Sequence, residues 1–379
     1  MPKTRRVRSV GVEEELLLVD GQNGRPTAIA GRLLRRWDAV APDVSSSAGE
    51  DGGTIEGELQ QQQIEIDTAP CTTLDDVGDQ ILSWRRRADD LARTSGGRAV
   101  AVGTAAPPVS PDVMPSDRYR AMAQHFGLTV AEQLTCGCHI HVGVDTPDEG
   151  VAVIDRIRIW LPALLAISAN SPFWQGRDSG YASYRSRSWE RFPTAGPTDK
   201  FGGLAGYRGR VAALLATGVP LDEGMIYFDA RLSHRYPTVE VRVADVCLAA
   251  PDTVLLAGLV RALVETAARA WADGDPVRDV PVALLRMASW RASRSGLEGD
   301  LLDPYSARPR PAADVVEALF DHVAPAARDL GDQDALRSGL NHLRERGTGA
   351  RWQRAAYQRS GSLQEMILRA ADRTLEKEL

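Results

Sequence analysis

Paired glutamates near the start of the chain are the first residues that could perform chemistry. Glu13 and Glu15 stand in the segment from 10 to 18, where apolar and polar residues alternate. This alternation predicts a half-buried β-strand and directs both carboxylates to one face. Two like charges so close repel each other unless a cation lies between them, and Mg²⁺ or Mn²⁺ prefers such oxygen ligands. A solvated acidic strand face is the alternative interpretation of this run.

A second strand with a polar face is predicted in Gln63-Ile-Glu-Ile-Asp67, where Glu65 lies on the polar side. Glu58 has the opposite parity from Glu65, so in a regular strand its side chain would leave from the other face. If the two carboxylates serve one site, the chain must contain a bulge or a turn between them.

A third predicted strand, over 135–144, carries Cys136, Cys138, His139 and His141. All four residue types bind zinc. Strand alternation places the cysteines on the aliphatic face and the histidines on the other, and four ligands cannot converge from opposite faces of a strand. We therefore expect the histidines to line a polar cavity and the cysteines to lie in the core behind it.

The fourth strand, over 237–245, has valines on one face and Glu240 and Arg242 on the other. Four strands of this kind predict an α+β fold with a largely antiparallel sheet. Its apolar face would pack on helices, and its polar face would line a concave site. Several carboxylates and a histidine suit two or three Mg²⁺ ions, whose remaining valences usually go to phosphates.

The segment from 170 to 197 combines arginines, hydroxyl side chains and aromatic residues. A loop this long without secondary structure is usually functional or disordered. Arginines and hydroxyls match the needs of anionic ligand groups, and the aromatic residues argue against disorder. We interpret the segment as a binding loop, with a solvated surface loop as the alternative.

The remaining elements are predicted mainly as helices. No internal repeat or domain boundary is evident, so residues 1–379 are expected to form a single domain. The predictions are a turn and short helix at 26–40, a loop at 42–53, helices at 73–94, 116–131, 151–169 and 203–217, strands at 99–103 and 225–230, and a mainly helical region from 251 onward, interrupted at 274–281 and 296–311.

Composition excludes several classes of function. A net charge of −6 gives no electrostatic reason to expect nucleic acid or an anionic membrane as a partner. No apolar run approaches the ~18 residues of a membrane span. Four cysteines are too few for a disulfide scaffold and lead us to expect a cytoplasmic protein. No Walker-type phosphate loop occurs, and Lys200 is the single interior lysine available for Schiff-base chemistry.

In combination, these segments resemble the glutamate–cysteine ligase type 2 family of ATP-dependent carboxylate–amine ligases, whose fold is similar to the catalytic domain of glutamine synthetase. The resemblance covers nearly the whole chain. It rests on Gly11-Val-Glu-Glu-Glu15, Gln63-Ile-Glu-Ile-Asp67, Gly137-Cys-His-Ile-His-Val142, Asn170-Ser-Pro-Phe-Trp174, Val239-Glu-Val-Arg242 and Gly347-Thr-Gly-Ala350.

The resemblance implies the cofactors ATP and Mg²⁺ or Mn²⁺, together with a set of site residues. The implied metal ligands are Glu13, Glu15, Glu58, Glu65, His139 and Glu240. The residues implied to contact phosphate or substrate are Arg185, Arg187, Arg235 and Arg242, with Arg185, Arg235 and Arg242 at the reacting groups and Tyr184 and Asn170 beside the nucleotide.

The implied reaction joins a small carboxylate, glutamate by family membership, to an amine such as cysteine. ATP would convert the carboxylate to an acyl phosphate, and the amine would displace phosphate. Two alternatives stay open: a guanido-kinase-like phosphotransferase with the same architecture, and a non-catalytic ATP-binding protein. The helical second half also offers surface for a homodimer.

Overall fold

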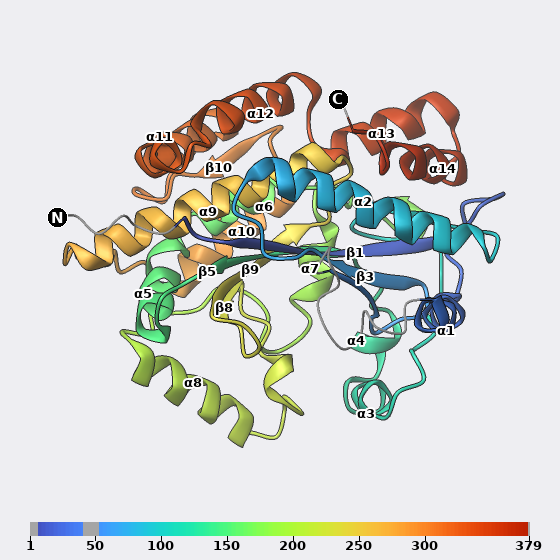
Figure 1. The fold of residues 1–379 in the computed structure, drawn as a ribbon, viewed down its shortest axis with the longest axis horizontal. Helices are drawn as coiled ribbons and strands as arrows, with labels where there is room; N and C mark the ends of the chain where they lie inside the picture. The colour runs from blue at the N-terminus through green and yellow to red at the C-terminus, as the bar shows by residue number, and fades with distance from the viewer. Residues whose placement is uncertain (1–6, 41–52, 378–379) are drawn as a thin grey trace.

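An antiparallel β-sheet crosses the middle of the molecule (Figure 1). The computed structural model describes residues 7–40 and 53–377, so nearly all of the loop predicted at 42–53 lies outside the described residues. The strand order is β2-β3-β1-β5-β9-β8, and β4 also pairs with β1. The strands are β1 (Val10–Asp20), β2 (Thr54–Gly57), β3 (Gln63–Asp67), β4 (Gly97–Val100), β5 (Gly137–Gly143), β8 (Ala230–Leu232) and β9 (Thr238–Asp245).

The register of the sheet brings the polar positions of different strands side by side. Glu13 on β1 lies directly opposite His139 on β5. Glu15 lies opposite Glu65 on β3, and His141 lies opposite Glu240 on β9. Residues opposite one another in an antiparallel pair have Cβ atoms about 4.5–5.5 Å apart, so their charges interact directly.

The other face of the sheet is apolar and packs against helices. Val12, Ile140 and Val241 join the largest core cluster with residues of α9 (Ala250–Ala272), α2 (Leu74–Arg93) and α6 (Leu161–Ser168). Burying each such aliphatic side chain contributes about 1.5–3 kcal/mol. This confirms the prediction of a sheet with helices on its apolar face.

The middle glutamate of the first strand points into this helical layer. Glu14 accepts hydrogen bonds from Arg85 Nε and Nη2 of α2, both at 2.7 Å, and from Thr253 Oγ1 of α9, also at 2.7 Å. The two charged side chains are 1% and 0% exposed. Strand alternation thus separates this structural carboxylate from its two neighbours.

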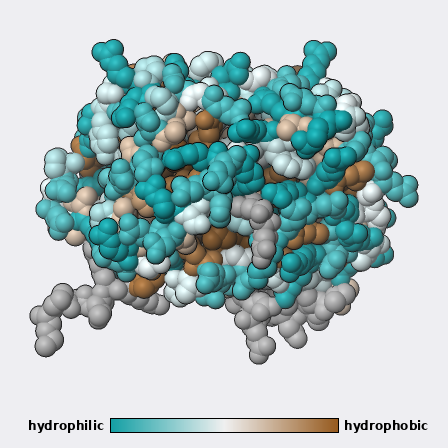
Figure 2. All heavy atoms as spheres, turned by 90° about the horizontal axis from the view of Figure 1, so that it is seen from above, coloured by the Kyte–Doolittle hydropathy of each residue, from teal (hydrophilic) through white to brown (hydrophobic). Residues whose placement is uncertain are grey.

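Further helices complete the two sides of the molecule. The C-terminal helices form an outer layer above α2 and α9 in Figure 1, and seen from above this surface is mainly hydrophilic with scattered hydrophobic residues (Figure 2). Among the described residues, no helix combines the length and apolar composition that crossing a membrane requires. The remaining elements are α1 (Ala30–Val40), α3 (Asp117–Phe126), α4 (Leu128–Ala131), α5 (Pro147–Ile157), β6 (Phe173–Trp174), β7 (Arg177–Asp178), α7 (Tyr184–Trp189), α8 (Leu204–Ala216), the 3₁₀-helix η1 (Glu223–Met225), α10 (Val282–Ser295), β10 (Asp300–Leu302), β11 (Pro309–Pro311), α11 (Ala312–Leu330), α12 (Gln333–Arg346), α13 (Gly349–Ser360) and α14 (Leu363–Arg373).

Two predicted helices are interrupted in the structure. The prediction of one uninterrupted helix at 151–169 is wrong, because α5 ends at Ile157 and α6 begins at Leu161. Pro162 occupies the first turn of α6, where a missing N–H is tolerated. The helix predicted at 116–131 breaks at Gly127, whose φ of 53° lies in the left-handed region that favours glycine.

Two further predictions near the site also need correction. The strand predicted at 225–230 is wrong, because the chain forms η1 and enters β8 only at Ala230. The segment from 170 to 197 is not a structureless loop: it contains the hairpin β6–β7 and the helix α7, which Ser183 caps by accepting a hydrogen bond from Ser186 N. That residues 1–379 form a single domain stays a prediction.

Candidate functional site

The polar face of the sheet borders a cavity of about 220 Å³, which we call the acidic cavity. Its floor consists of side chains from four strands, as the alternation patterns predict. These residues are Glu13, Glu15, Glu65, His139, His141, Glu240 and Arg242.

Glu13 lies between the two histidines of β5. His139 Nδ1 lies 3.0 Å from Glu13 Oε2, and His141 Nε2 lies 2.9 Å from Glu13 Oε1. Burial would raise the pKa of Glu13, but the contacts with the two histidines outweigh it and hold the pKa well below its usual value. Glu13 is therefore a carboxylate at neutral pH.

Three other carboxyl groups crowd together beside Glu13. Burial, and then the charges of Glu13 and Asp67, raise the pKa of Glu65 well above its usual value. Burial and the charge of Glu15 raise the pKa of Glu58 to about 7. Such mutual repulsion is relieved either by protons or by a bound cation.

Glu58 reaches this group through a turn. β2 ends at Gly57 and β3 begins at Gln63, so the two carboxylates do not belong to one regular strand. The chain reverses between them, and Glu58 Oε2 accepts a hydrogen bond of 2.6 Å from Leu59 N. Because Glu58 and Glu65 have opposite parity, a bulge or a turn between them was required for both to reach one site, and the structure contains such a turn.

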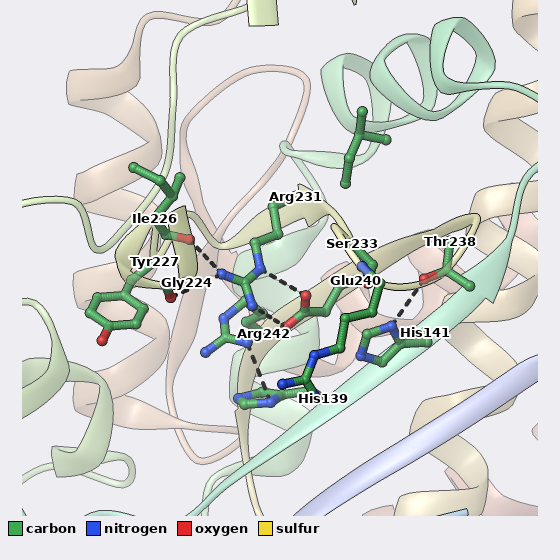
Figure 3. A network of polar contacts seen from close by, with 12 residues as sticks. His139, His141, Gly224, Ile226, Tyr227, Arg231, Ser233, Thr238, Glu240 and Arg242 are labelled. Carbon is green, nitrogen blue, oxygen red and sulfur yellow. Dashed lines mark hydrogen bonds and ion pairs between the residues drawn. The ribbon is translucent and has the colours of Figure 1, made fainter. Parts of the chain in front are cut away.

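Glu240 lies between two arginines, as Figure 3 shows. Arg231 Nε donates to Glu240 Oε2 at 2.7 Å, and Arg242 Nη1 pairs with Glu240 Oε1. Burial would raise the pKa of Glu240, but the two guanidinium groups lower it far below its usual value. Sequence reasoning missed Arg231, because its position opposite Glu240 depends on the β8–β9 register of the folded chain.

The acidic groups fit a divalent cation. Each of three overlapping groups has ligand atoms within 4.8 Å of one another: Glu13, Glu65 and His139; Glu13, His141 and Glu240; and Glu15, Glu58 and Glu65. His139 Nε2 is buried and has no hydrogen-bond partner among the described residues. Carboxylates with an imidazole nitrogen suit Mg²⁺ or Mn²⁺. These groups bring all six predicted ligands together and add His141.

Aromatic side chains also line the cavity. Tyr119, Trp189, Phe192 and Tyr227 line the acidic cavity together with Met122. Sequence reasoning did not assign these residues to a site, because helix α3 and the segments around 189 and 227 meet only in the folded chain. The lining of the cavity therefore combines charged and aromatic side chains.

The predicted arginines fall into two places. Arg235 and Arg242 line the acidic cavity. Arg185 and Arg187 line a second cavity of about 20 Å³, which also contacts Arg242. Arg185 is 2% exposed and lies beneath Gly137 of β5, where its Nη1 is 4.0 Å from Asp245 Oδ1.

Asn170 and Tyr184 lie outside the acidic cavity, and their role beside the nucleotide stays a prediction. Asn170 Nδ2 donates to the carbonyl oxygens of Ala101 and Val246, and its Oδ1 accepts from Gln353 Nε2. Tyr184 contacts aromatic rings of its own segment. Neither side chain is among the described residues that line the acidic cavity. The amide of Asn170 is occupied in joining segments of the fold.

The cysteines lie in the core, as predicted. Cys136 and Cys138 are buried in apolar clusters behind the sheet, and burial raises their thiol pKa values well above normal. None of the cation-binding groups among the described residues contains a cysteine.

Comparison with known proteins identifies the family of this chain. The model of glutamate–cysteine ligase family 2 (GCS2) matches residues 9–369. A candidate glutamate–cysteine ligase 2-1 of Streptomyces avermitilis is 50% identical over 369 residues, which cover 97% of this chain and 99% of the relative. A candidate glutamate–cysteine ligase 2 of Streptomyces coelicolor is 49% identical over 368 residues, again covering 97% and 99%.

Two solved structures share the fold. The glutamate–cysteine ligase of Francisella tularensis, in complex with AMP, has a TM-score of 0.65 at 13% identity and covers 98% of this chain and 89% of that chain. A bifunctional glutathione synthetase of Pasteurella multocida has a TM-score of 0.67 at 14% identity and covers 97% and 52%. On its family match and its close relatives, the chain belongs to glutamate–cysteine ligase family 2 and is a ligase of the glutamate–cysteine ligase type.

Proposed function

We propose that this protein joins a small carboxylate to an amine with the hydrolysis of ATP to ADP and phosphate. One observation carries the proposal: seven carboxyl and imidazole groups that could hold a metal lie in one cavity with Arg235 and Arg242. The names of the relatives suggest glutamate as the acid and cysteine as the first amine to test.

The chemistry requires activation of the acid. An amine does not displace oxide from a carboxylate, so the γ-phosphoryl group of ATP is first transferred to the carboxylate oxygen and ADP leaves. The amine nitrogen then attacks the carbonyl carbon of the acyl phosphate, the C–O bond to phosphate breaks, and the amine loses a proton. The first step thus replaces a poor leaving group, oxide, with a better one, phosphate, which the second step expels.

The residues of the acidic cavity have separate roles in this proposal. The acidic ligands would hold Mg²⁺ or Mn²⁺, which offsets phosphate charge when bound. Arg242 would neutralise the transferring phosphoryl group, because its guanidinium is buried and held by Glu240. Arg235 is exposed at the β8–β9 turn and would bind phosphate or the substrate carboxylate.

A coupled ADP-release assay tests the proposal. The assay contains Mg²⁺, ATP and glutamate with a panel of amines that includes cysteine, and mass spectrometry identifies the products. An amide that requires both substrates supports the ligase. A stable phosphorylated product without an amide indicates a phosphotransferase, and nucleotide binding without turnover across the panel contradicts catalysis with glutamate.

Matched variants connect activity to the cavity. Glu13→Gln should abolish turnover, because it removes the charge shared by two of the ligand groups. Glu132→Gln changes the same functional group in an exposed ion pair with Arg191, outside the cavity, and should retain activity. Equal activity in both variants would refute the site assignment.

A further inference from the structure

Arg231 lines the acidic cavity and binds the carboxylate of Glu240 at two points. Its Nε donates to Glu240 Oε2 at 2.7 Å, and its Nη2 donates to Glu240 Oε1 at 3.2 Å. Both oxygens of one carboxylate therefore face one planar guanidinium, the geometry that gives arginine its directional strength. Figure 3 shows this pair beside Arg242 and the histidines of β5.

The far side of the same guanidinium is held by the backbone. Arg231 Nη1 donates to the carbonyl oxygens of Gly224 at 3.3 Å and Ile226 at 3.0 Å (Figure 3). These carbonyls belong to the segment around η1, which continues into the cavity-lining Tyr227. Arg231 cannot rotate away from Glu240 without losing these bonds.

Glu240 retains capacity for another partner in this arrangement. A carboxylate has about four lone-pair directions, and Arg231 and Arg242 together supply three N–H contacts. A Glu240 oxygen also lies within 4.8 Å of ligand atoms of Glu13 and His141. Arg231 therefore fixes the rotamer of Glu240, whose carboxylate lies close enough to Glu13 and His141 to bind one cation with them.

From these contacts we infer that Arg231 is a positioning residue, which orients Glu240 for the cation shared with Glu13 and His141. The inference rests on the proposed function, since it requires Glu240 to be a metal ligand. Residues that orient metal ligands typically contribute 10–100-fold to metal affinity. Lysine at this position would keep the charge but not the two-point contact.

Mn²⁺ binding to the intact protein, without ATP or substrate, tests the role independently of catalysis. Isothermal titration and electron paramagnetic resonance give the Kd, and Glu240→Gln provides the reference loss. Arg231→Met should weaken binding at the affected site roughly 10–100-fold. Arg231→Lys should recover little of that loss. The double variant should lose no more than Glu240→Gln alone, because both changes disable the same ligand.

A control variant separates positioning from loop support. Thr194 Oγ1 donates to Met225 O and accepts from Tyr227 N at 3.2 Å, so it holds the same segment without touching Glu240. Thr194→Val should lower Tm while leaving the Kd for Mn²⁺ unchanged. If Thr194→Val weakens Mn²⁺ binding as much as Arg231→Met, Arg231 acts only as loop support and the inference is overturned.

Two further outcomes distinguish failure of the positioning role of Arg231 from failure of Glu240 as a metal ligand. Unchanged affinity in Arg231→Met with a clear loss in Glu240→Gln overturns the positioning role and leaves the proposed metal site intact. Unchanged affinity in Glu240→Gln removes Glu240 from the ligand set, and the inference fails with it. In that second case the ADP-release assay still decides whether the protein is a ligase.

Discussion

Replacing Glu14 by glutamine tests whether the middle glutamate of β1 is structural. Its carboxylate is 1% exposed and, within residues 7–40 and 53–377, carries the only charge that pairs with Arg85, which is fully buried. The variant keeps the size and shape of the side chain but leaves the guanidinium charge uncompensated. Breaking a buried ion pair by removing one partner typically costs about 3–5 kcal/mol.

The expected shift in Tm follows from the length of the chain. A protein of 379 residues has an unfolding entropy of about 0.8 kcal/mol/K near its Tm, at roughly 2.1 cal/mol/K per residue. A loss of 3–5 kcal/mol therefore lowers Tm by about 4–6 °C. Calorimetry measures this shift, and circular dichroism confirms that the variant is folded before heating.

Neighbouring variants sharpen the test. Glu13→Gln changes the adjacent residue on the opposite face and should abolish turnover with less than half of the Tm shift. Arg85→Met should cost more than Glu14→Gln, because Arg85 also donates to the carbonyl oxygens of Cys247, Leu248 and Thr374. A Tm of Glu14→Gln within 1 °C of the wild-type value would refute the buried-pair argument.

Three other predictions follow from the site and its surroundings. Gly137→Ala should reduce turnover at least tenfold, because a Cβ atom there overlaps Arg185 Nη2; unchanged kinetics would contradict that contact. The four buried cysteines should react with a thiol reagent only after unfolding, and rapid reaction of the folded protein would contradict their burial. In metal-free protein, the pKa values of Glu58 and Asp67 are raised to about 7 and about 8, so the folded state holds protons that the unfolded state releases above about pH 4. The unfolding free energy should therefore fall as pH rises from 5 to 8, Mg²⁺ should offset the loss at pH 8, and a Tm that rises over this window without metal would contradict the prediction.

Local patterns in the sequence were sufficient to predict on which face of its strand each side chain lies. Alternation assigned Glu13 and Glu15 to one face of β1, and it assigned Cys136 and Cys138 to the face opposite the histidines. These assignments depend only on the two-residue period of a strand, which adjacent residues determine. The α+β fold class and the residues on the floor of the acidic cavity could therefore be predicted without coordinates.

Some features near the site could not be predicted from the sequence, because they depend on contacts between distant segments. The turn after Gly57 brings Glu58 to Glu65, and the amide of Asn170 joins backbone segments instead of facing the acidic cavity. A polar residue in a motif looks the same in sequence whether it binds a ligand or a carbonyl oxygen. Only its neighbours in space distinguish the two.

The pairing of strands and the walls of the cavity were decided by the tertiary structure alone. Glu13 meets His139, and Arg231 meets Glu240, because of a register between strands that are far apart in the chain. The aromatic side chains of the cavity likewise come together only when α3 and the segment around Trp189 meet in the folded chain. Alternation by itself determines to which face of a strand a side chain points. The residue that it meets on the neighbouring strand depends on the register, and a one-residue slip in register would move every apolar side chain to the polar face. The register is therefore selected by how the whole chain buries its apolar faces.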